Sequence, residues 1–310
     1  MKARAWTALI AVYIVWGSTY LAIRFTIETI PPFLSAGLRF LISGAILYLW
    51  QRWGGETAPK KVEWRSAAII GLLLLLGGNG CLVWAEQGIP SGIASLFIAT
   101  APLWMVLIDA IRPGGTRANW LTWLGVLVGL SGTALLANPW QTHTTNPSLD
   151  PIGMAVLIFA ALSWSVGSLY SRKASLPNSP LMGTGMEMLV GSLGLFILAT
   201  ITGEWSQFHL TAISMRSLGG LAWLIVFGSG IGFVAYTWLL RNAPTPIVST
   251  YAYVNPVVAI ILGNLIANET LESLELISAL IIITGVVLIT TARTLADRKA
   301  HRVPLIPGED

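Results

Sequence analysis

The side chains of this sequence that could do chemistry are aromatic rings and uncharged polar groups within apolar segments. Trp16 and Trp164 lie near the middle of two such segments, and small residues follow each of them. Small residues let helix backbones approach closely, so the two indoles either fill grooves between helices or line a cavity. Rings combined with hydroxyl and amide groups bind small amphipathic molecules. The expected chemistry is therefore reversible binding.

Two glycine-rich runs, at 77–80 and 228–232, lie inside long apolar segments. We expect both runs to interrupt a helix, because breaks at membrane depth are tolerated where the backbone is buried or faces a water-filled cavity. Asn79 lies inside the first run, and Trp84 and Tyr236 follow the two runs by one helical turn. These three residues are candidates for lining a cavity. The glycines expected to act as flexing points are Gly78, Gly80, Gly230 and Gly232.

Two further apolar segments contain an internal proline, Pro102 or Pro256. A proline removes a hydrogen-bond donor and clashes with the preceding turn, so we expect a kink and a freed carbonyl at each. The neighbouring Thr100 and Asn255 either bind a substrate or satisfy the freed groups, and the sequence favours neither reading. Tyr251, four residues before Asn255, is a further candidate for binding.

Charged residues within the apolar segments are few, and two of them, Arg39 and Glu187, occupy equivalent positions of a repeat described below. Each is about seven residues, or roughly 10 Å, from its own side of the membrane, so we expect them on opposite sides of the midplane and not in contact. They serve either as structural anchors or in gating. Glu86, at the end of the third segment, is expected to be a solvated loop carboxylate, the alternative being a group that attracts cations.

Catalytic and metal-binding clusters are not expected. The three histidines, His143, His209 and His301, fall in loops or the tail, so no buried histidine cluster is available for catalysis. The only cysteine, Cys81, excludes an intrachain disulfide and a cysteine-based metal site. The sequence thus predicts a protein that is not an enzyme and that uses no cofactor and no metal.

The composition indicates which elements position these residues. Only 10% of the 310 residues are charged, 55% are hydrophobic, and the mean hydropathy is +0.72. Segments of about 20 apolar residues span a bilayer core roughly 30 Å thick as helices. The sequence predicts an all-α integral membrane protein with ten transmembrane helices near 5–25, 32–50, 65–85, 89–111, 119–137, 151–173, 180–202, 216–239, 246–268 and 274–292.

The second half of the chain repeats the first. Residues 16–24 (WGSTYLAIR) align with 164–172 (WSVGSLYSR) at an offset of 148, and residues 32–41 align with 180–189 at the same offset. Each repeat has five helices, and an odd number gives two repeats of opposite orientation, as in many secondary transporters. We expect a first repeat over 1–137, an external linker over 138–150, a second repeat over 151–292 and a cytoplasmic tail over 293–310.

The loop charges predict the orientation in the membrane. With the N-terminus inside, most of the 18 Lys and Arg residues fall on the cytoplasmic side, as the positive-inside rule requires. Both termini are therefore expected in the cytoplasm, and the net charge of +4 indicates topology and not nucleic-acid binding. The external connections are acidic, with Glu28, Glu86, Asp150, Glu204, Glu269, Glu272 and Glu275.

The chain resembles the ten-helix EamA-type members of the drug/metabolite transporter superfamily. The resemblance rests on WGSTY at 16–20, the pair Arg39-Phe40, the stretch 90–102 and VNP at 254–256, in this order and with duplication. It implies an exporter of the bacterial inner membrane, with a central cavity between the first, third, fourth, sixth, eighth and ninth helices. The candidate lining residues that it implies are Trp16, Tyr20, Asn79, Trp84, Thr100, Trp164, Tyr236, Tyr251 and Asn255.

Departures from related families narrow the expected substrate. The first helix has no acidic residue between Met1 and Phe25, unlike the small multidrug relatives, and Arg39 is the only basic residue within the membrane, too few for a diphosphate. We expect facilitated, alternating-access export of small amphipathic metabolites, with neutral or aromatic amino acids first. The alternatives are broad drug or toxic-metabolite efflux by proton antiport and a non-transporting membrane scaffold. The expected partners are a small-molecule substrate and the lipid bilayer, with no nucleic acid, and the expected state is a monomer or weak homo-oligomer.

Overall fold

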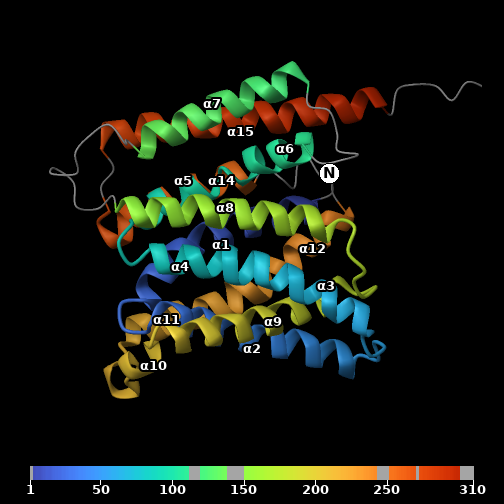
Figure 1. Cartoon of the computed structure of the whole chain (residues 1–310), viewed down its shortest axis with the longest axis vertical. Coiled ribbons are helices and arrows are strands. Elements are labelled where there is room, and N and C mark those ends of the chain that lie inside the picture. Colours follow the sequence, from blue (N-terminus) through green and yellow to red (C-terminus); the bar gives the residue numbers. More distant parts are fainter. Residues whose placement is uncertain (1–2, 112–118, 138–149, 243–250, 270–271, 301–310) are drawn as a thin grey trace, which may run out of the picture.

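The computed structural model describes residues 3–111, 119–137, 150–242, 251–269 and 272–300, and the regular elements in these ranges are all helices (Figure 1). Within them, eight helices are long and apolar enough to cross a membrane, and the apolar helices Trp120–Leu136 and Val254–Ala267 are shorter. The all-α membrane fold predicted from the sequence is thereby confirmed. Most predicted helix limits lie within a few residues of the observed ones.

The helices of the first half alternate in direction across the bundle. They are α1 (Ala3–Thr26), α2 (Pro32–Trp53), a continuous span made of α3 (Lys61–Gly71), η1 (Leu72–Gly80) and α4 (Cys81–Ala85), then α5 (Ser91–Ile98), α6 (Ala101–Ile111) and α7 (Trp120–Ala137).

The second half follows the same plan. It contains α8 (Pro151–Ser171), α9 (Pro180–Ile201), the short α10 (Glu204–Gln207) and η2 (Leu210–Ala212), a span made of α11 (Met215–Trp223), η3 (Leu224–Ile231) and α12 (Gly232–Asn242), then α14 (Tyr251–Ala267) and α15 (Ser273–Ala300).

The prediction that the glycine runs interrupt their helices is wrong. The run 77–80 is the end of the π-helical segment η1, and the run 228–232 spans the end of η3 and the first residue of α12. Both π-helical segments continue directly into the next α-helix. Gly80 and Gly232 have ordinary right-handed helical angles, with φ −60° and ψ −45° at Gly80 and φ −59° and ψ −49° at Gly232. The helix therefore widens locally, with i→i+5 backbone hydrogen bonds, and does not unwind.

The two prolines act differently. The helix stops at Ile98 and resumes at Ala101, directly before Pro102, so this span is interrupted where the sequence predicts a kink. Pro256 instead lies inside α14, which runs without a break from Tyr251 to Ala267.

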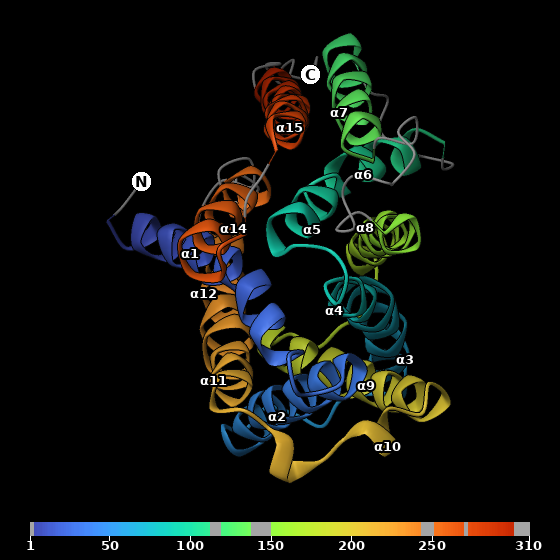
Figure 2. The ribbon, with the colours of Figure 1, turned by 90° about the vertical axis from the view of Figure 1, so that its left-hand side faces the viewer.

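The contacts between helices pair equivalent elements of the two halves. In both views α7 packs along α15 at one edge of the bundle and α2 along α9 at the opposite edge (Figures 1 and 2). Between these edges, α1 packs on α14, α11 and α12, whereas α8 packs on η1, α4 and α6. The first helix of each half thus packs against the third and fourth spans of the other half, as expected for a repeated unit.

The bundle has two chemically different ends. We call the end where α1 ends and α2 begins the acidic end, because Glu28, Glu86, Asp150, Glu204 and Glu269 lie there, and the opposite end, where α1 begins, the basic end. Pro32 and Pro151 open α2 and α8 at the acidic end, where their missing N–H costs nothing. Asp150 completes the start of α8 by accepting from Ile152 N and Gly153 N, both at 3.1 Å.

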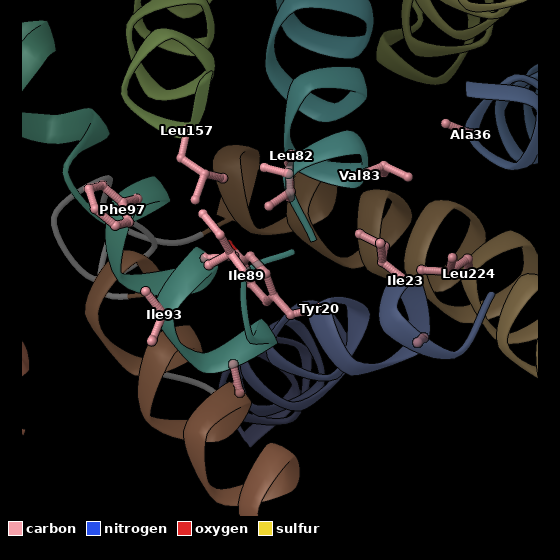
Figure 3. Close-up of a cluster of buried hydrophobic side chains, with 14 of the residues drawn as sticks. Tyr20, Ile23, Ala36, Leu82, Val83, Ile89, Ile93, Phe97, Leu157 and Leu224 are labelled. Atoms are coloured by element: carbon pink, nitrogen blue, oxygen red, sulfur yellow. The ribbon is translucent and has the colours of Figure 1, made fainter. Parts of the chain in front are cut away.

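The largest apolar core includes many residues of the acidic half of the bundle, and Figure 3 shows part of it. Tyr20 and Ile23 of α1 join Ile93 and Phe97 of α5 and Leu157 of α8 in this core, all at most 8% exposed. The first four helices and the second repeat therefore meet tightly at this end.

Candidate substrate site

Four aromatic rings from three helices meet between the two halves of the chain. Trp16 of α1 lies 4.9 Å from Tyr236 of α12, 5.2 Å from Tyr251 of α14 and 5.4 Å from Phe233 of α12, measured between ring centroids. The rings of Tyr236 and Tyr251 are 5.6 Å apart, and their hydroxyl groups are hydrogen-bonded. We call these four residues the aromatic cluster. All four are half-buried.

Glycines determine where the indole of Trp16 lies. Its Nε1 donates a hydrogen bond of 3.2 Å to the carbonyl oxygen of Gly228 in η3. A Cβ atom on Gly232 would lie 2.4 Å from the same Nε1, a distance that no side chain tolerates. The indole therefore occupies the room left by the missing side chain of Gly232, and the bond to Gly228 fixes its orientation.

Trp164 of α8 is placed in the equivalent way. A Cβ atom on Gly78 of η1 would lie 3.1 Å from Cε3 of Trp164, and the indole is half-buried. Each half of the chain thus lays the tryptophan of its first helix on the π-helical glycine run of the other half. Both interpretations of the two tryptophans, packing and cavity lining, agree with this geometry.

The residue after each tryptophan makes a second equivalent contact. Gly17 approaches the carbonyl oxygen of Asn255, which would lie 3.2 Å from a Cβ atom on Gly17. Ser165 donates a hydrogen bond of 2.9 Å to the carbonyl oxygen of Ala101. Asn255 and Ala101 are the residues before Pro256 and Pro102, so the two contacts correspond.

Two asparagine side chains offer free acceptors. Asn255, 6% exposed, and the half-buried Asn79 each have a buried Oδ1 that accepts no hydrogen bond from the described residues. A buried amide oxygen without a donor costs about 1–3 kcal/mol, so such groups are usually completed by water or a ligand. Asn255 lies four residues after Tyr251, on the same side of α14 as the aromatic cluster.

Three other predicted residues lie in packed surroundings. Thr100 is fully buried, and its hydroxyl donates to Phe97 O at 2.6 Å and accepts from Trp104 Nε1 at 3.1 Å. Tyr20 belongs to the core of the acidic half, and Trp84 packs against that core. Tyr20 nevertheless lies within electrostatic range of Tyr251 of the aromatic cluster, whereas Thr100 and Trp84 are held in other contacts.

Arg39 and Glu187 have separate surroundings, in line with the expectation that they do not touch. Arg39 is 4% exposed, and its Nε donates to Ser229 Oγ in η3 at 3.0 Å. Its Nη1 has no hydrogen-bond partner among the described residues, and its Nη2 would lie 3.2 Å from a Cβ on Gly228. The guanidinium therefore lies against the same glycine that binds the indole of Trp16.

Sequence reasoning missed Phe233 and Ser229. Phe233 precedes Tyr236 by three residues, so a search for aromatic residues spaced along one helix face would have found it. Ser229 lies inside the glycine run 228–232, and its partnership with Arg39 depends on how α2 packs on η3, which no local pattern encodes.

Carboxylates of the second half hold helix starts of the first half at the acidic end. Glu204 accepts from Phe33 N at 3.1 Å and Leu34 N at 2.8 Å in the first turn of α2. Burial raises the pKa of Glu204, and the two backbone N–H bonds oppose that rise. Negative charge at a helix N-terminus is favourable, so this contact ties the two halves together.

A second carboxylate does the same for α5. Glu269, which follows α14, accepts from the backbone N and the hydroxyl of Ser91 at 3.1 and 2.8 Å and from Gly92 N at 3.3 Å. Beside it, Arg216 pairs with Glu28 at 3.1 Å across the halves. Four charged residues, Arg24, Glu28, Arg216 and Glu269, line a pocket of about 200 Å³ that opens at this end. Within the described ranges, no three His, Cys, Asp or Glu residues come together as metal ligands.

Comparison with known proteins agrees with this architecture. The model of the EamA-like transporter family matches residues 4–138 and 151–291. An uncharacterized inner membrane transporter of Escherichia coli K12, YedA, is 38% identical over 301 residues, which cover 96% of this chain and 94% of that relative. A WAT1-related chloroplastic protein of Arabidopsis thaliana is 27% identical over 92% of this chain and 69% of its own length.

A solved structure shares the fold. A protein crystal structure superimposes with a TM-score of 0.62 at 22% identity, covering 95% of this chain and 99% of that chain. The family and YedA carry transporter names, which agrees with a role other than catalysis. The matches to the family model take in nearly the whole chain and the membrane-spanning helices. This multi-pass membrane protein belongs to the EamA-like transporter family.

Proposed function

We propose that this protein is a secondary transporter of the inner membrane that exports small amphipathic metabolites, with neutral or aromatic amino acids as the first choice. The basic end of the bundle faces the cytoplasm, because the positive-inside rule places the Lys- and Arg-rich loops there. Both termini are then cytoplasmic, and the acidic end is external. Export proceeds by alternating access between these two ends.

The observation that carries the proposal is the aromatic cluster beside the free amide oxygen of Asn255. Half-buried rings of Trp16, Tyr236 and Tyr251 provide a surface for an apolar or aromatic side chain. The Oδ1 of Asn255 lacks a donor, and the ammonium group of an amino acid would supply one. Rings with one well-placed acceptor form a site for a small amphipathic molecule.

The two ends of the bundle support a direction for the cycle. At the acidic end Glu204, Glu269 and the Arg216–Glu28 pair join the two halves above a packed core. These contacts separate the aromatic cluster from the external side. Release of a substrate to that side requires them to part, while the half-buried rings receive substrate from the cytoplasmic side.

Uptake into proteoliposomes tests the proposal. Radiolabelled amino acids and other metabolites are offered to the purified protein, with empty liposomes as the control, and saturable uptake with counterflow establishes transport of that class. Trp16→Ala and Trp164→Ala should weaken the apparent affinity about fivefold, since each removes roughly 1 kcal/mol of ring contact. Trp64→Ala is the matched control, because Trp64 packs against Tyr48 outside the aromatic cluster, with ring centroids 5.8 Å apart.

The outcomes separate transport from a scaffold role. Normal affinity in both Trp16→Ala and Trp164→Ala would remove the two tryptophans from the substrate site. Absence of uptake across the panel, together with no thermal stabilisation by any compound, would favour a non-transporting scaffold. Thermal stabilisation by one class without uptake would leave the binding site in place and contradict export.

A further inference from the structure

The side chain of Glu86 lies in the turn after α4, at the acidic end. It is 0% exposed, although the sequence predicts a solvated loop carboxylate. Neither of its two carboxyl oxygens accepts a hydrogen bond from the described residues. A charged carboxylate in such surroundings would be strongly destabilising, so the group holds a proton in this conformation.

The nearby charges do not compensate this carboxyl. Arg24 of α1 donates to the backbone oxygens of Glu86 and Gln87, at 2.5 and 3.3 Å, and thereby serves the main chain and not the carboxyl group. Glu269 contributes negative charge, which disfavours a second anion beside it. The pKa of Glu86 is raised well above its ordinary value, mainly by burial and further by Glu269, against the opposing effect of Arg24.

The other elements around this turn bring few titratable groups toward Glu86. From α1, the phenol of Tyr20 lies within electrostatic range. Asp150, at the start of α8, accepts from its own helix, and Glu204, beside the start of α2, accepts from Phe33 and Leu34. These two carboxylates are therefore committed to backbone N–H groups, whereas neither carboxyl oxygen of Glu86 has a partner among the described residues.

The outer side of Glu86 is the polar one. Arg24 and Glu269, the two charged neighbours of Glu86, line the pocket of about 200 Å³ at the acidic end. On the inner side, Tyr20 of the apolar core lies within electrostatic range of Glu86, and Ile89 of the same core follows Glu86 by three residues (Figure 3). The pocket thus lies on the acidic-end side of Glu86, whereas a packed core lies between Glu86 and the basic end.

We propose that Glu86 is a proton-binding site that controls the opening of the acidic end. With the proton bound, the neutral carboxyl is compatible with the closed packing. Separation of the two halves admits water, and the carboxyl then loses its proton through the outer pocket. The proton enters and leaves on the same side, so the site regulates substrate exit without proton antiport. This inference rests on the alternating access of the proposed function.

The expected pH dependence follows from the coupling between proton binding by Glu86 and closure of the acidic end. The closed conformation has the higher proton affinity, so acid favours it and rising pH favours the open one. Between the proton affinities of the two conformations, the open-to-closed ratio should rise about tenfold per pH unit, as for one linked proton. Export into an acidic medium should be slow for the same reason.

Distances between two spin labels across the acidic end test the proposal. The only cysteine, Cys81, is replaced by Ala, and labels are attached through Gly88→Cys in the first half and Gly219→Cys in the second, because both glycines are exposed with open space around them. Pulsed electron paramagnetic resonance in nanodiscs is recorded from about pH 5 to about pH 9. A longer distance should gain population as pH rises, and Glu86→Gln should keep the short distance throughout.

Two controls make the result specific. Glu28→Gln removes an exposed carboxylate from the same end together with its pairing to Arg216, so it should shift the open-to-closed ratio by a constant factor and retain the response to pH. Glu86→Asp keeps a titrating carboxyl and should also respond, which covers the case in which Glu86→Gln does not fold. A wild-type distribution that is the same at every pH overturns the proposal, as does a full response in folded Glu86→Gln. Because no substrate is present, this result is independent of the uptake test of the proposed function.

Discussion

The indole Nε1 of Trp16 donates to the carbonyl oxygen of Gly228 at 3.2 Å and so joins the first helix of one repeat to the π-helical segment of the other. Trp164 covers Gly78 in the equivalent position of the opposite pair. The tryptophans and the glycine runs are therefore two parts of one contact. The glycines remove side chains where the indoles need room, and the π-helical backbone leaves a carbonyl for the indole to bind.

This contact predicts the effect of Gly232→Ala. A new Cβ would lie 2.4 Å from Nε1 of Trp16 and must displace the indole, so we expect a loss of about 1–3 kcal/mol in stability and a strong reduction in uptake. Trp16→Phe removes the clashing nitrogen and should restore part of the stability in the double variant. Gly219→Ala is the control, because its Cβ meets open space. Equal thermal unfolding of the two glycine variants would contradict the contact.

The bond between Ser165 and Ala101 predicts a smaller effect. Ser165→Ala removes the hydrogen bond of 2.9 Å between α8 and α6, and side-chain hydrogen bonds between membrane helices contribute about 0.6 kcal/mol. Ser131→Ala provides the reference, since Ser131 is exposed and donates only to Val128 O of its own helix. Gly17→Ala, whose Cβ would lie 2.5 Å from Val258 Cβ, should cost more than either. Thermal unfolding in detergent gives the order of the three variants.

Much of the fold could be predicted from the sequence. Length and hydropathy defined the ten membrane segments, and the repeated residues 16–24 and 164–172 defined the relation between the halves. Both signals are periodic or local, so they can be recognised in the sequence without any knowledge of packing. The nature of the glycine runs did not follow, because a π-helical widening and a helix break call for the same residue types.

The candidate site was predictable only in part. Trp16, Tyr236 and Tyr251 stood out as aromatic residues beside glycine or polar residues, and they do meet in the structure. Thr100 stood out for the same kind of reason, yet its hydroxyl is occupied by Phe97 and Trp104. Burial of Glu86 depends on how α1 and the segment after α14 close over one turn, and a charge in a predicted loop gives no sign of that.

The bond between Arg39 and Ser229 predicts a contrast between two substitutions. Ser229→Ala leaves the Nε of a buried guanidinium without an acceptor, so we expect a loss of about 1–3 kcal/mol. Arg39→Met removes the buried charge together with its need for partners, and such replacements are often neutral or stabilising. Chemical unfolding should therefore rank Arg39→Met above Ser229→Ala. The reverse order would mean that other groups satisfy the guanidinium. Thr284→Ala, at an exposed threonine, sets the baseline for a lost hydroxyl.

Burial of Glu86 predicts a specific pH dependence of stability in addition to gating. Its pKa is raised in the folded protein and ordinary in the unfolded chain, so between these two values the folded state binds more protons. Stability should then fall as pH rises above the ordinary carboxyl range, by up to about 1.4 kcal/mol per pH unit from this group. Glu86→Gln cannot ionise and should lack this part of the decline. At neutral pH the variant should melt no lower than the wild type.

Thermal unfolding of both proteins across pH measures the difference, with Glu28→Gln as the carboxylate control. A parallel decline in wild type and Glu86→Gln would place the responsible group elsewhere. It would contradict the prediction that ionisation of Glu86 destabilises the folded protein.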